Sequence, residues 1–407
     1  MTSNIVIIGG GHAAAQLCAG LAEAGQGARV HLVCEEAALP YHRPPLSKTF
    51  LKAPDEQLQQ HRAEAWYAEA GITLHLGDAA LAIDRSARTV TLRSGVVLGW
   101  ERLVLATGTR ARRLSTLAGL SNVALLRAAD EAAQLRTQLA AAQHVTVLGG
   151  GFIGLEVAAT ALALGKQVLV LESAPRLLSR AVSPELSAHV LTTHRAAGMD
   201  VRVGVQCGVM EVEGPRLASI EVDGEPRAID LLLLGIGAVP ETSLAEAAGL
   251  ECADGIVVDA YMQTSDVAVL AVGDCTRFPD RRAGRALRLE SVQNANDQAR
   301  TAVATLTGAP KPHDAVPWFW SDQGGLRLQM AGLVPTAGTP AHSTVRRPGA
   351  NPASFSLLHY VDGVLRCVES VNAPMDHMMS RKILEAGRNP DPAVAADPAV
   401  PLKSHLA

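Results

Sequence analysis

The sequence predicts an α/β protein with two doubly wound nucleotide-binding domains and a smaller third domain. Two observations predict the doubly wound domains. A buried strand, three glycines and a helix of small residues occur twice, at residues 4–24 and 145–164, and a second apolar strand follows each time. The third domain is predicted from Trp318 onward, where polar and apolar residues alternate between turns rich in Gly and Pro.

Each βαβ unit has elements whose type follows from its residues. The first strands are short apolar runs that suit a strand buried on both faces, and a glycine ends each helix. The expected elements are strand 4–8, helix 12–24 and strand 29–34 in the first unit, and strand 145–149, helix 152–164 and strand 167–172 in the second.

Further strand-like runs follow each unit and suggest how the domains are connected. Their order indicates that the second domain is inserted into the first, which resumes near residue 240. The tail from Arg388, rich in Pro, Ala and Asp, is expected to be weakly structured. The predicted domains are 1–111 with 241–317, then 112–240, and a C-terminal α+β domain at 318–407.

Composition excludes several classes of function. The 407 residues are 48% hydrophobic and 19% charged, which suits two or three domains with buried cores. The net charge of −4 argues against nucleic acid or an anionic membrane as the main partner. With no secretory signal and no membrane-length apolar run, we expect a cytoplasmic protein. The six cysteines form no CxxC or CxxxxC pair, and no metal site is expected.

The glycine loops are typical of sites that hold a pyrophosphate. The first glycine permits a tight turn, the third lets the phosphates approach the backbone, and the sixth position sets how closely helix and strand pack. These positions are Gly9, Gly11 and Ala14 in the first unit and Gly149, Gly151 and Gly154 in the second. His12, beside the first loop, is expected to be a helix-start residue near the pyrophosphate rather than a catalytic base.

An acidic residue near the end of the second strand is expected to bind a ribose diol. Glu35 takes this role in the first unit and Glu172 in the second. A carboxylate at Glu172 would repel a 2′-phosphate, and Arg176 and Arg180 nearby are interpreted as surface residues, so NADH is favoured over NADPH. Two dinucleotides in one chain indicate that one reduces the other, with a flavin first and a nicotinamide second.

Several longer motifs carry a more specific resemblance. They are LPYHRPPLSK at 39–48, LVLATG at 103–108, GGGFIGLEVAATA at 149–161, TSDVAVLAVGDC at 264–275, ESVQNANDQAR at 290–300 and PWFWSDQ at 317–323. Together they resemble the FAD-dependent ferredoxin reductases of bacterial oxygenase systems, within the glutathione-reductase-like superfamily. The resemblance runs over essentially the whole chain.

The resemblance implies a set of cofactor-binding residues. Those implied for FAD are Gly9, Gly11, Ala13, Glu35, Arg43, Lys48, Ala80, Thr107, Gly108, Arg127, Asp274 and Val292. Those implied for NAD are Gly149, Gly151, Ile153, Gly154, Glu172 and Gly237. The residues implied to act at the reacting rings are Lys48, Glu156, Glu290 and Trp320, with an ion pair expected between Lys48 and Glu156. Ala14 departs from the glycine common among relatives, and no loss of FAD is expected from it.

The implied activity is that of a ferredoxin–NAD(+) reductase, which passes electrons from NADH through FAD to a 2Fe–2S ferredoxin. The ferredoxin in turn feeds an oxygenase of aromatic-hydrocarbon catabolism. The stretch YHRPPLSK lacks the thiols of disulfide reductases, so electrons are expected to leave the flavin directly. Two alternatives stay open: an NADH oxidase or quinone reductase that uses a small acceptor, and a flavin-binding interaction protein with vestigial redox activity.

Overall fold

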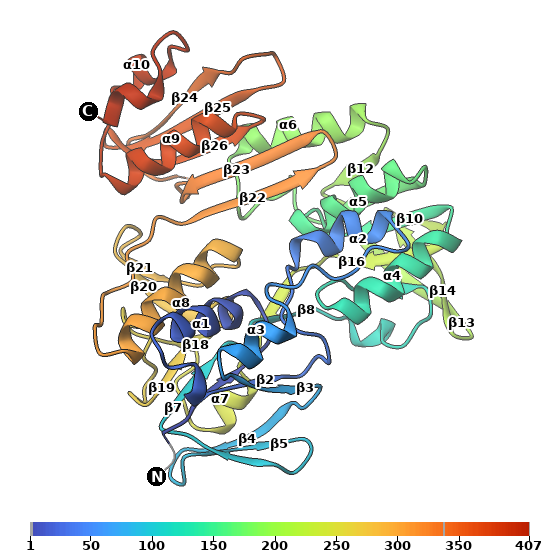
Figure 1. Ribbon diagram of the computed structural model, residues 1–407. Coiled ribbons are helices and arrows are strands. Elements are labelled where there is room, and N and C mark those ends of the chain that lie inside the picture. The colour runs from blue at the N-terminus through green and yellow to red at the C-terminus, as the bar shows by residue number, and fades with distance from the viewer. Residues whose placement is uncertain (1–2, 337, 407) are drawn as a thin grey trace. The chain divides into compact units, whose positions relative to one another are not determined.

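The computed structural model describes residues 3–336 and 338–406. By its internal contacts the chain divides into two compact units, each assembled from segments distant in sequence (Figure 1). Unit 1 contains residues 1–43, 58–110 and 239–315, and unit 2 contains residues 44–57, 111–238 and 316–407. Residues 44–57 thus group with the second nucleotide loop. The division into three domains stays a prediction. Within the described ranges, no helix is both long and apolar enough to cross a membrane.

The core of unit 1 is a five-stranded parallel sheet in the order β19-β7-β1-β2-β3. Two helices of unit 1, α1 and α8, pack closely against each other because Gly20 of α1 has no side chain. A Cβ at Gly20 would lie 2.9 Å from a methyl group of Val303. The bounds are β1 Ile5–Ile8, α1 His12–Glu23, β2 Val30–Cys34, β3 Thr73–Leu76, β7 Arg102–Leu105, β19 Val269–Ala271 and α8 Val292–Leu306.

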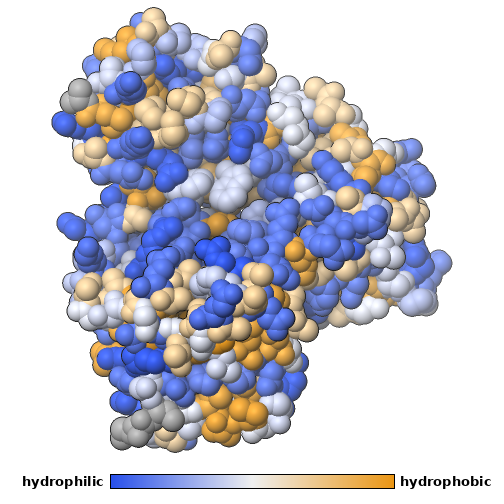
Figure 2. Space-filling view, in the orientation of Figure 1, coloured by the Kyte–Doolittle hydropathy of each residue, from blue (hydrophilic) through white to orange (hydrophobic). Residues whose placement is uncertain are grey.

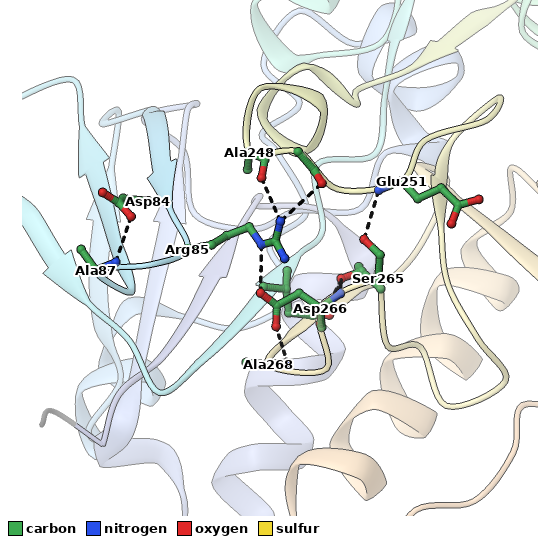
Figure 3. A network of polar contacts seen from close by, with 11 residues as sticks. Asp84, Arg85, Ala87, Ala248, Glu251, Ser265, Asp266 and Ala268 are labelled. Carbon is green, nitrogen blue, oxygen red and sulfur yellow. Dashed lines mark hydrogen bonds and ion pairs between the residues drawn. The ribbon is translucent and has the colours of Figure 1, made fainter.

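A polar network fastens the returning segment of unit 1 to an earlier hairpin (Figure 3). Arg85 pairs with Asp266 at 2.9 Å and donates to the carbonyl oxygens of Ala248 and Gly249 at 3.3 Å. These partners lie 163 to 181 residues further along the chain. The hairpin belongs to a small antiparallel sheet of β4 (Ala80–Asp84), β5 (Thr89–Leu92) and β6 (Val97–Gly99).

The same small sheet exposes apolar side chains, among them Leu81 and Val97. Figure 2 shows hydrophobic surface in the part of the view where Figure 1 draws β4 and β5. Elsewhere in this view the surface is mostly hydrophilic.

Unit 2 contains a second five-stranded parallel sheet, in the order β12-β11-β10-β16-β9. Leu171 and Leu232 lie in its hydrophobic core. The predicted second βαβ unit is therefore present, and the two doubly wound sheets confirm the predicted fold. The bounds are β9 Val123–Ala124, α4 Ala129–Ala141, β10 His144–Leu148, α5 Phe152–Ala163, β11 Gln167–Glu172, α6 Pro184–Ala196, β12 Asp200–Val203 and β16 Leu231–Leu234.

The C-terminal part of unit 2 is a five-stranded antiparallel sheet in the order β22-β23-β26-β25-β24, as its alternating pattern predicts. The bounds are β22 Trp318–Gln323, β23 Leu326–Gly332, β24 His342–Pro348, β25 Phe355–Val361, β26 Val364–Val371 and α9 Pro374–Glu385.

The expectation of a weakly structured tail was wrong. Asp391 caps a short helix, α10 (Pro392–Ala396), and a 3₁₀ turn follows at Leu402–Leu406. Ala395 and Leu402 are buried in the same hydrophobic cluster as Leu358 and Val368 of the sheet. Small and apolar residues that look like a linker in sequence thus complete a core.

The remaining elements are short. They are α2 Thr49–Lys52, α3 Glu64–Glu69, β8 Thr109–Ala111, β13 Cys207–Glu213, β14 Arg216–Val222, β15 Glu225–Ala228, β17 Ala238–Pro240, α7 Ser243–Ala247, β18 Ile256–Val257, β20 Thr276–Asp280 and β21 Arg285–Leu287.

Candidate functional site

The loop between β1 and α1 has the backbone of an anion-binding cradle. Gly9 has a φ of +122°, and a Cβ there would lie 2.1 Å from the carbonyl oxygen of Ala106, so only glycine fits. A Cβ on Gly11 would meet no atom within 4 Å, which leaves open space beside the loop. No side chain of the described residues caps α1 at Gly11. Its first N–H groups are therefore available to a phosphate.

The sixth position of this loop differs from that of the second loop. Ala14 is completely buried and Ala13 is nearly so, and the helix accommodates both methyl groups. The structure thus gives no reason for glycine at Ala14.

The acidic residues after the two second strands stand in different registers. The strand pairing places Cys34 in the first unit where Glu172 lies in the second, so Glu35 lies one residue further along. The Glu35 side chain is 78% exposed and pairs with Arg93 at 3.3 Å. A ribose contact by Glu35 stays a prediction.

Arg43 is held as a cation in unit 1. Its guanidinium pairs with Glu36 at 2.8 Å and donates to the hydroxyl of Tyr41 at 3.0 Å. Burial lowers the pKa of Arg43, but Tyr41, Glu36 and Asp274 raise it, and the net shift is upward. The predicted FAD residues Arg43 and Asp274 therefore interact electrostatically.

The other predicted FAD residues of unit 1 lie at element ends. Thr107 follows β7 and donates its hydroxyl hydrogen to the carbonyl of Glu241 at 2.6 Å. Gly108 has a φ of +67°, Val292 begins α8, and Ala80 begins β4. The carboxyl ends of parallel strands are the usual place for nucleotide contacts, and Thr107 and Gly108 follow such an end.

The second glycine loop, in unit 2, differs from the first mainly at its sixth position. Gly149 has a φ of +110°, and a Cβ there would lie 2.4 Å from the carbonyl oxygen of Gly235. A Cβ at Gly154 would lie 2.5 Å from the carbonyl oxygen of Gly149. At Gly151 only that same Gly235 oxygen would come near, at 3.9 Å, so space remains for a ligand. This loop therefore requires glycine at the sixth position, as the sequence pattern predicts.

Glu172 is fixed at the end of β11 by backbone hydrogen bonds. Its carboxylate accepts from the N–H of Gly150 at 2.6 Å and from the N–H of Ala174 at 2.7 Å. Arg176 donates to the carbonyl oxygens of Ser179 and Val182, at 2.6 and 2.9 Å. Arg176 thus holds its own loop and is not a free cation for a 2′-phosphate.

Three other residues complete the surroundings of this loop. Ile153, at the start of α5, is exposed. Gly237 is exposed with a φ of +104°, and a Cβ there would lie 3.6 Å from the guanidinium of Arg180. Arg180 is the one cation of the predicted pair that remains beside the loop.

The predicted ion pair between Lys48 and Glu156 is present in unit 2. The Lys48 Nζ lies 2.6 Å from Glu156 Oε2, and the two side chains are 21% and 5% exposed. Glu156 lies in α5 among buried apolar residues. A carboxylate in such surroundings is stable only when it is paired and hydrogen-bonded.

Two buried hydroxyl groups complete the shell of Glu156, and sequence reasoning missed both. Ser47 donates to Oε2 at 2.5 Å, and Ser321 donates to Oε1 at 2.7 Å. Gln323 donates to the Ser321 hydroxyl at 3.0 Å and accepts from His194 at 2.9 Å. Burial lowers the pKa of His194, while the bond to Gln323 opposes this.

The sequence held part of a signal for Ser321 and Gln323, but none for Ser47. Alternation along β22 puts Phe319, Ser321 and Gln323 on one face and the tryptophans on the other, and Ser321 and Gln323 are buried. Phe319 contacts Phe152 of α5 at a ring-centroid distance of 4.5 Å. Alternation along β22 would therefore have placed both polar side chains on the same face as Phe319, without identifying the helix that this face contacts.

The opposite face of β22 carries the tryptophans. Trp320 and Trp318 are half-buried, with ring centroids 5.5 Å apart. Trp318 is also covered by Arg381, whose guanidinium lies 4.2 Å from the ring centroid. Trp318 is thus packed within unit 2, and the role of Trp320 stays a prediction.

Two further predicted residues lie outside these clusters. Glu290 is exposed in unit 1 and pairs with Arg288 at 2.6 Å. Arg127, in unit 2, precedes α4, and its N–H donates to Glu131 at 2.8 Å. The structure does not test their predicted roles.

The cysteines do not form a redox pair. All six are free, and Cys18, Cys34, Cys275 and Cys367 are buried. Burial, with the charge of Glu36, raises the pKa of Cys34 to about 12, so its thiol stays protonated and unreactive.

Comparison with protein families matches almost the whole chain. Residues 3–299 match the family described as pyridine nucleotide-disulphide oxidoreductase, and residues 318–406 match a family described as reductase C-terminal.

Individual relatives match over nearly their full length. Putidaredoxin reductase of Pseudomonas putida is 39% identical, with 99% of this chain and 97% of that protein covered. Rhodocoxin reductase of Rhodococcus erythropolis is 40% identical, with 99% and 94% covered. A crystal structure of a ferredoxin reductase for the CYP199A2 system of Rhodopseudomonas palustris is 42% identical, covers 100% of both chains and has a TM-score of 0.94. The covalent putidaredoxin reductase–putidaredoxin complex gives a TM-score of 0.92 at 37% identity, with 99% and 98% covered.

Proposed function

The chain belongs to the pyridine nucleotide-disulphide oxidoreductases, and we propose that it is a ferredoxin reductase that passes electrons from NADH through FAD to a 2Fe–2S ferredoxin. The observation that carries this proposal is the presence of two complete glycine-loop βαβ units in one chain whose relatives over nearly the full length include ferredoxin reductases. The ferredoxin would supply a bacterial oxygenase, and the enzyme would work in the cytoplasm.

The first loop fits the pyrophosphate of FAD. Its support is the open space at Gly11 and the uncapped start of α1. Arg43 brings a fixed positive charge to the same unit, in electrostatic contact with Asp274. The remaining FAD contacts proposed are Gly9, Ala13, Glu35, Lys48, Ala80, Thr107, Gly108, Arg127 and Val292.

The second loop fits NADH. Gly151 leaves room for the phosphates, and the fixed carboxylate of Glu172 suits a ribose diol. The Glu172 carboxylate would repel a 2′-phosphate, and the guanidinium of Arg176 already donates hydrogen bonds to two backbone carbonyl oxygens. Gly149, Ile153, Gly154 and Gly237 complete the proposed NAD residues.

Lys48 is proposed to carry the positive charge that faces the flavin. When bound, the flavin converts the two-electron donation of NADH into single-electron transfers. Lys48 would stabilise the negative charge that reduction places on the ring, and Glu156 would hold its Nζ in position together with Ser47. Glu290 would act beside the nicotinamide, and Trp320 would cover the ring.

The experiment that tests the function compares electron acceptors. The purified holoenzyme is reduced by NADH in a stopped-flow spectrometer, and turnover is then measured with a 2Fe–2S ferredoxin, with a quinone and with oxygen. We expect turnover with ferredoxin to exceed the other two by at least about a hundredfold. Equal or faster turnover with oxygen or the quinone would contradict the proposal and identify an oxidase or a quinone reductase. NADPH as the better donor would contradict the role of Glu172.

A further inference from the structure

Three histidines gather beside the first glycine loop in unit 1. His12 is the first residue of α1, and His42 and His61 come from two loop segments. One ring nitrogen from each lies within 4.8 Å of the others. The ring centroids are 5.5 Å apart for His12 and His42, 4.6 Å for His12 and His61, and 3.9 Å for His42 and His61.

Backbone hydrogen bonds fix two of the three. The N–H of His42 donates to the carbonyl of Gln59, and the N–H of His61 donates to the carbonyl of Pro40, both at 2.8 Å. These bonds pair the segments on either side of an antiparallel bridge between Tyr41 and Gln60. The contact between the rings of His42 and His61 therefore follows from the backbone pairing of their segments.

The ring of His61 has the features of a metal ligand. Its Nε2 is buried and, among the described residues, has no hydrogen-bond partner. The ring also forms a hydrogen bond with the backbone of Tyr41. A hydrogen bond of one ring nitrogen to backbone, with the other aimed at the ion, is the usual arrangement of a ligating histidine.

Burial favours the neutral form of His42 and His61, which is the form that binds a metal ion. Burial, with His42 and Arg62, lowers the pKa of His61 to about 4. Burial, with Arg62, also lowers the pKa of His42. Arg62 is the cation that opposes a bound ion, and its guanidinium is turned to the ring of Trp66, 5.6 Å from the centroid.

We propose that His12, His42 and His61 form a binding site for one divalent transition-metal ion, of the class represented by Zn²⁺. Zinc–nitrogen bonds of about 2.0–2.1 Å in tetrahedral geometry place ligand nitrogens roughly 3.3 Å apart. The exposed ring of His42 can rotate to close the remaining separation. Three histidines leave the fourth position open, as in sites that keep a water or an anion on the metal.

The ion would join three separate segments of unit 1. It would tie the start of α1 to the segments that precede Arg43 and follow Gln59. Binding that is specific to the folded state raises stability in proportion to the logarithm of ligand concentration over Kd. Zn²⁺ binding at this site does not depend on which electron acceptor the enzyme uses, so its test is separate from the test of the proposed function.

The test is Zn²⁺ binding to the untagged, flavin-loaded protein, measured by isothermal titration calorimetry and by the shift in Tm. The variants are His61→Gln and His42→Gln, and His75→Gln is the matched control. His75 is half-buried in the same unit and lies 3.2 Å from His31, outside the trio.

We expect one Zn²⁺ per chain and a higher Tm in the wild type and in His75→Gln. Affinity should fall at least about tenfold in His61→Gln and in His42→Gln. If His61→Gln does not fold, His42→Gln decides alone, because that side chain is exposed. The proposal would be overturned if the wild type did not bind Zn²⁺ stoichiometrically. It would also be overturned if His61→Gln and His42→Gln both bound Zn²⁺ with the affinity of the wild type.

Discussion

Removing the positive charge from the Lys48–Glu156 pair is expected to destabilise the protein by about 3 kcal/mol. Breaking a buried ion pair typically costs about 3–5 kcal/mol, because the remaining charge is left uncompensated. Lys48→Met would leave the Glu156 carboxylate 5% exposed, with hydrogen bonds from Ser47 and Ser321 still in place. These hydroxyls and the partial exposure of Lys48 place the expected cost at the lower end of the range.

A double-mutant cycle separates the pair from its surroundings. Glu156→Gln should cost about 1–2 kcal/mol, because Lys48 keeps bonds to the Pro44 carbonyl and the Ser47 hydroxyl. The double variant should be about 2 kcal/mol more stable than the sum of the single effects predicts. Lys52→Met, an exposed lysine of α2, is the control and should change stability by less than about 0.5 kcal/mol.

The assay is denaturant unfolding of the holoenzyme, interpreted only where the m value equals that of the wild type. Stopped-flow reduction by NADH adds a functional readout, and the proposed charge of Lys48 predicts a rate about tenfold slower in Lys48→Met, equivalent to about 1.4 kcal/mol. Additive single effects within about 0.5 kcal/mol would refute the coupling. A wild-type reduction rate in Lys48→Met would refute its role at the flavin.

Three other variants test separate parts of the structure. Glu172→Gln should raise the KM for NADH and narrow the preference over NADPH, measured as the ratio of the two kcat/KM values; an unchanged ratio would show that Glu172 does not select the donor. Gly154→Ala should lower the free energy of unfolding by about 1–3 kcal/mol, because its methyl group would lie 2.5 Å from the carbonyl oxygen of Gly149. Ala14→Gly, at the same position of the first loop, should change FAD binding little. His377→Leu should reduce the loss in the free energy of unfolding as the pH falls below about 6.5, measured by denaturant unfolding at several pH values. Burial, with Arg381 and Arg327, lowers the pKa of His377 to about 4, so the unfolded chain binds the extra proton and stability is lost as pH falls from about 6.5 towards 4, by about 3 kcal/mol. The same pH dependence of unfolding free energy in His377→Leu and in the wild type would contradict this role of His377.

The two glycine loops were predictable because their constraints are local. Each glycine is required by atoms within a few residues or on the adjacent strand, as at Gly9 and Gly149. The alternation after Trp318 predicted the antiparallel sheet for the same reason. The strand register could not be predicted from the sequence: Cys34 takes the position of Glu172, and Glu35 lies one residue further along.

Contacts between distant segments were beyond the sequence patterns, except where a family resemblance supplied them. The Lys48–Glu156 pair came from the resemblance. Ser47 and Ser321 lie within two of the quoted motifs, but they are 109 and 165 residues from Glu156, and no motif indicates that their hydroxyls contact it. The three histidines are likewise separated in sequence, and backbone pairing brings together the segments of His42 and His61. Hydrogen-bond partners of this kind are set by tertiary structure rather than by local propensity.

The buried charge in α5 is best understood by comparing the two helices. Gln16 in α1 stands where Glu156 stands in α5, counted from the first glycine of each loop. Both helices pack in doubly wound units, so a carboxylate is not needed for this fold. Replacing a buried ion pair by apolar residues is often neutral or stabilising. The Glu156 carboxylate, bonded by Lys48 and two hydroxyl donors, is therefore organised to hold a cation in one place, which is the arrangement that the proposed role of Lys48 at the flavin requires.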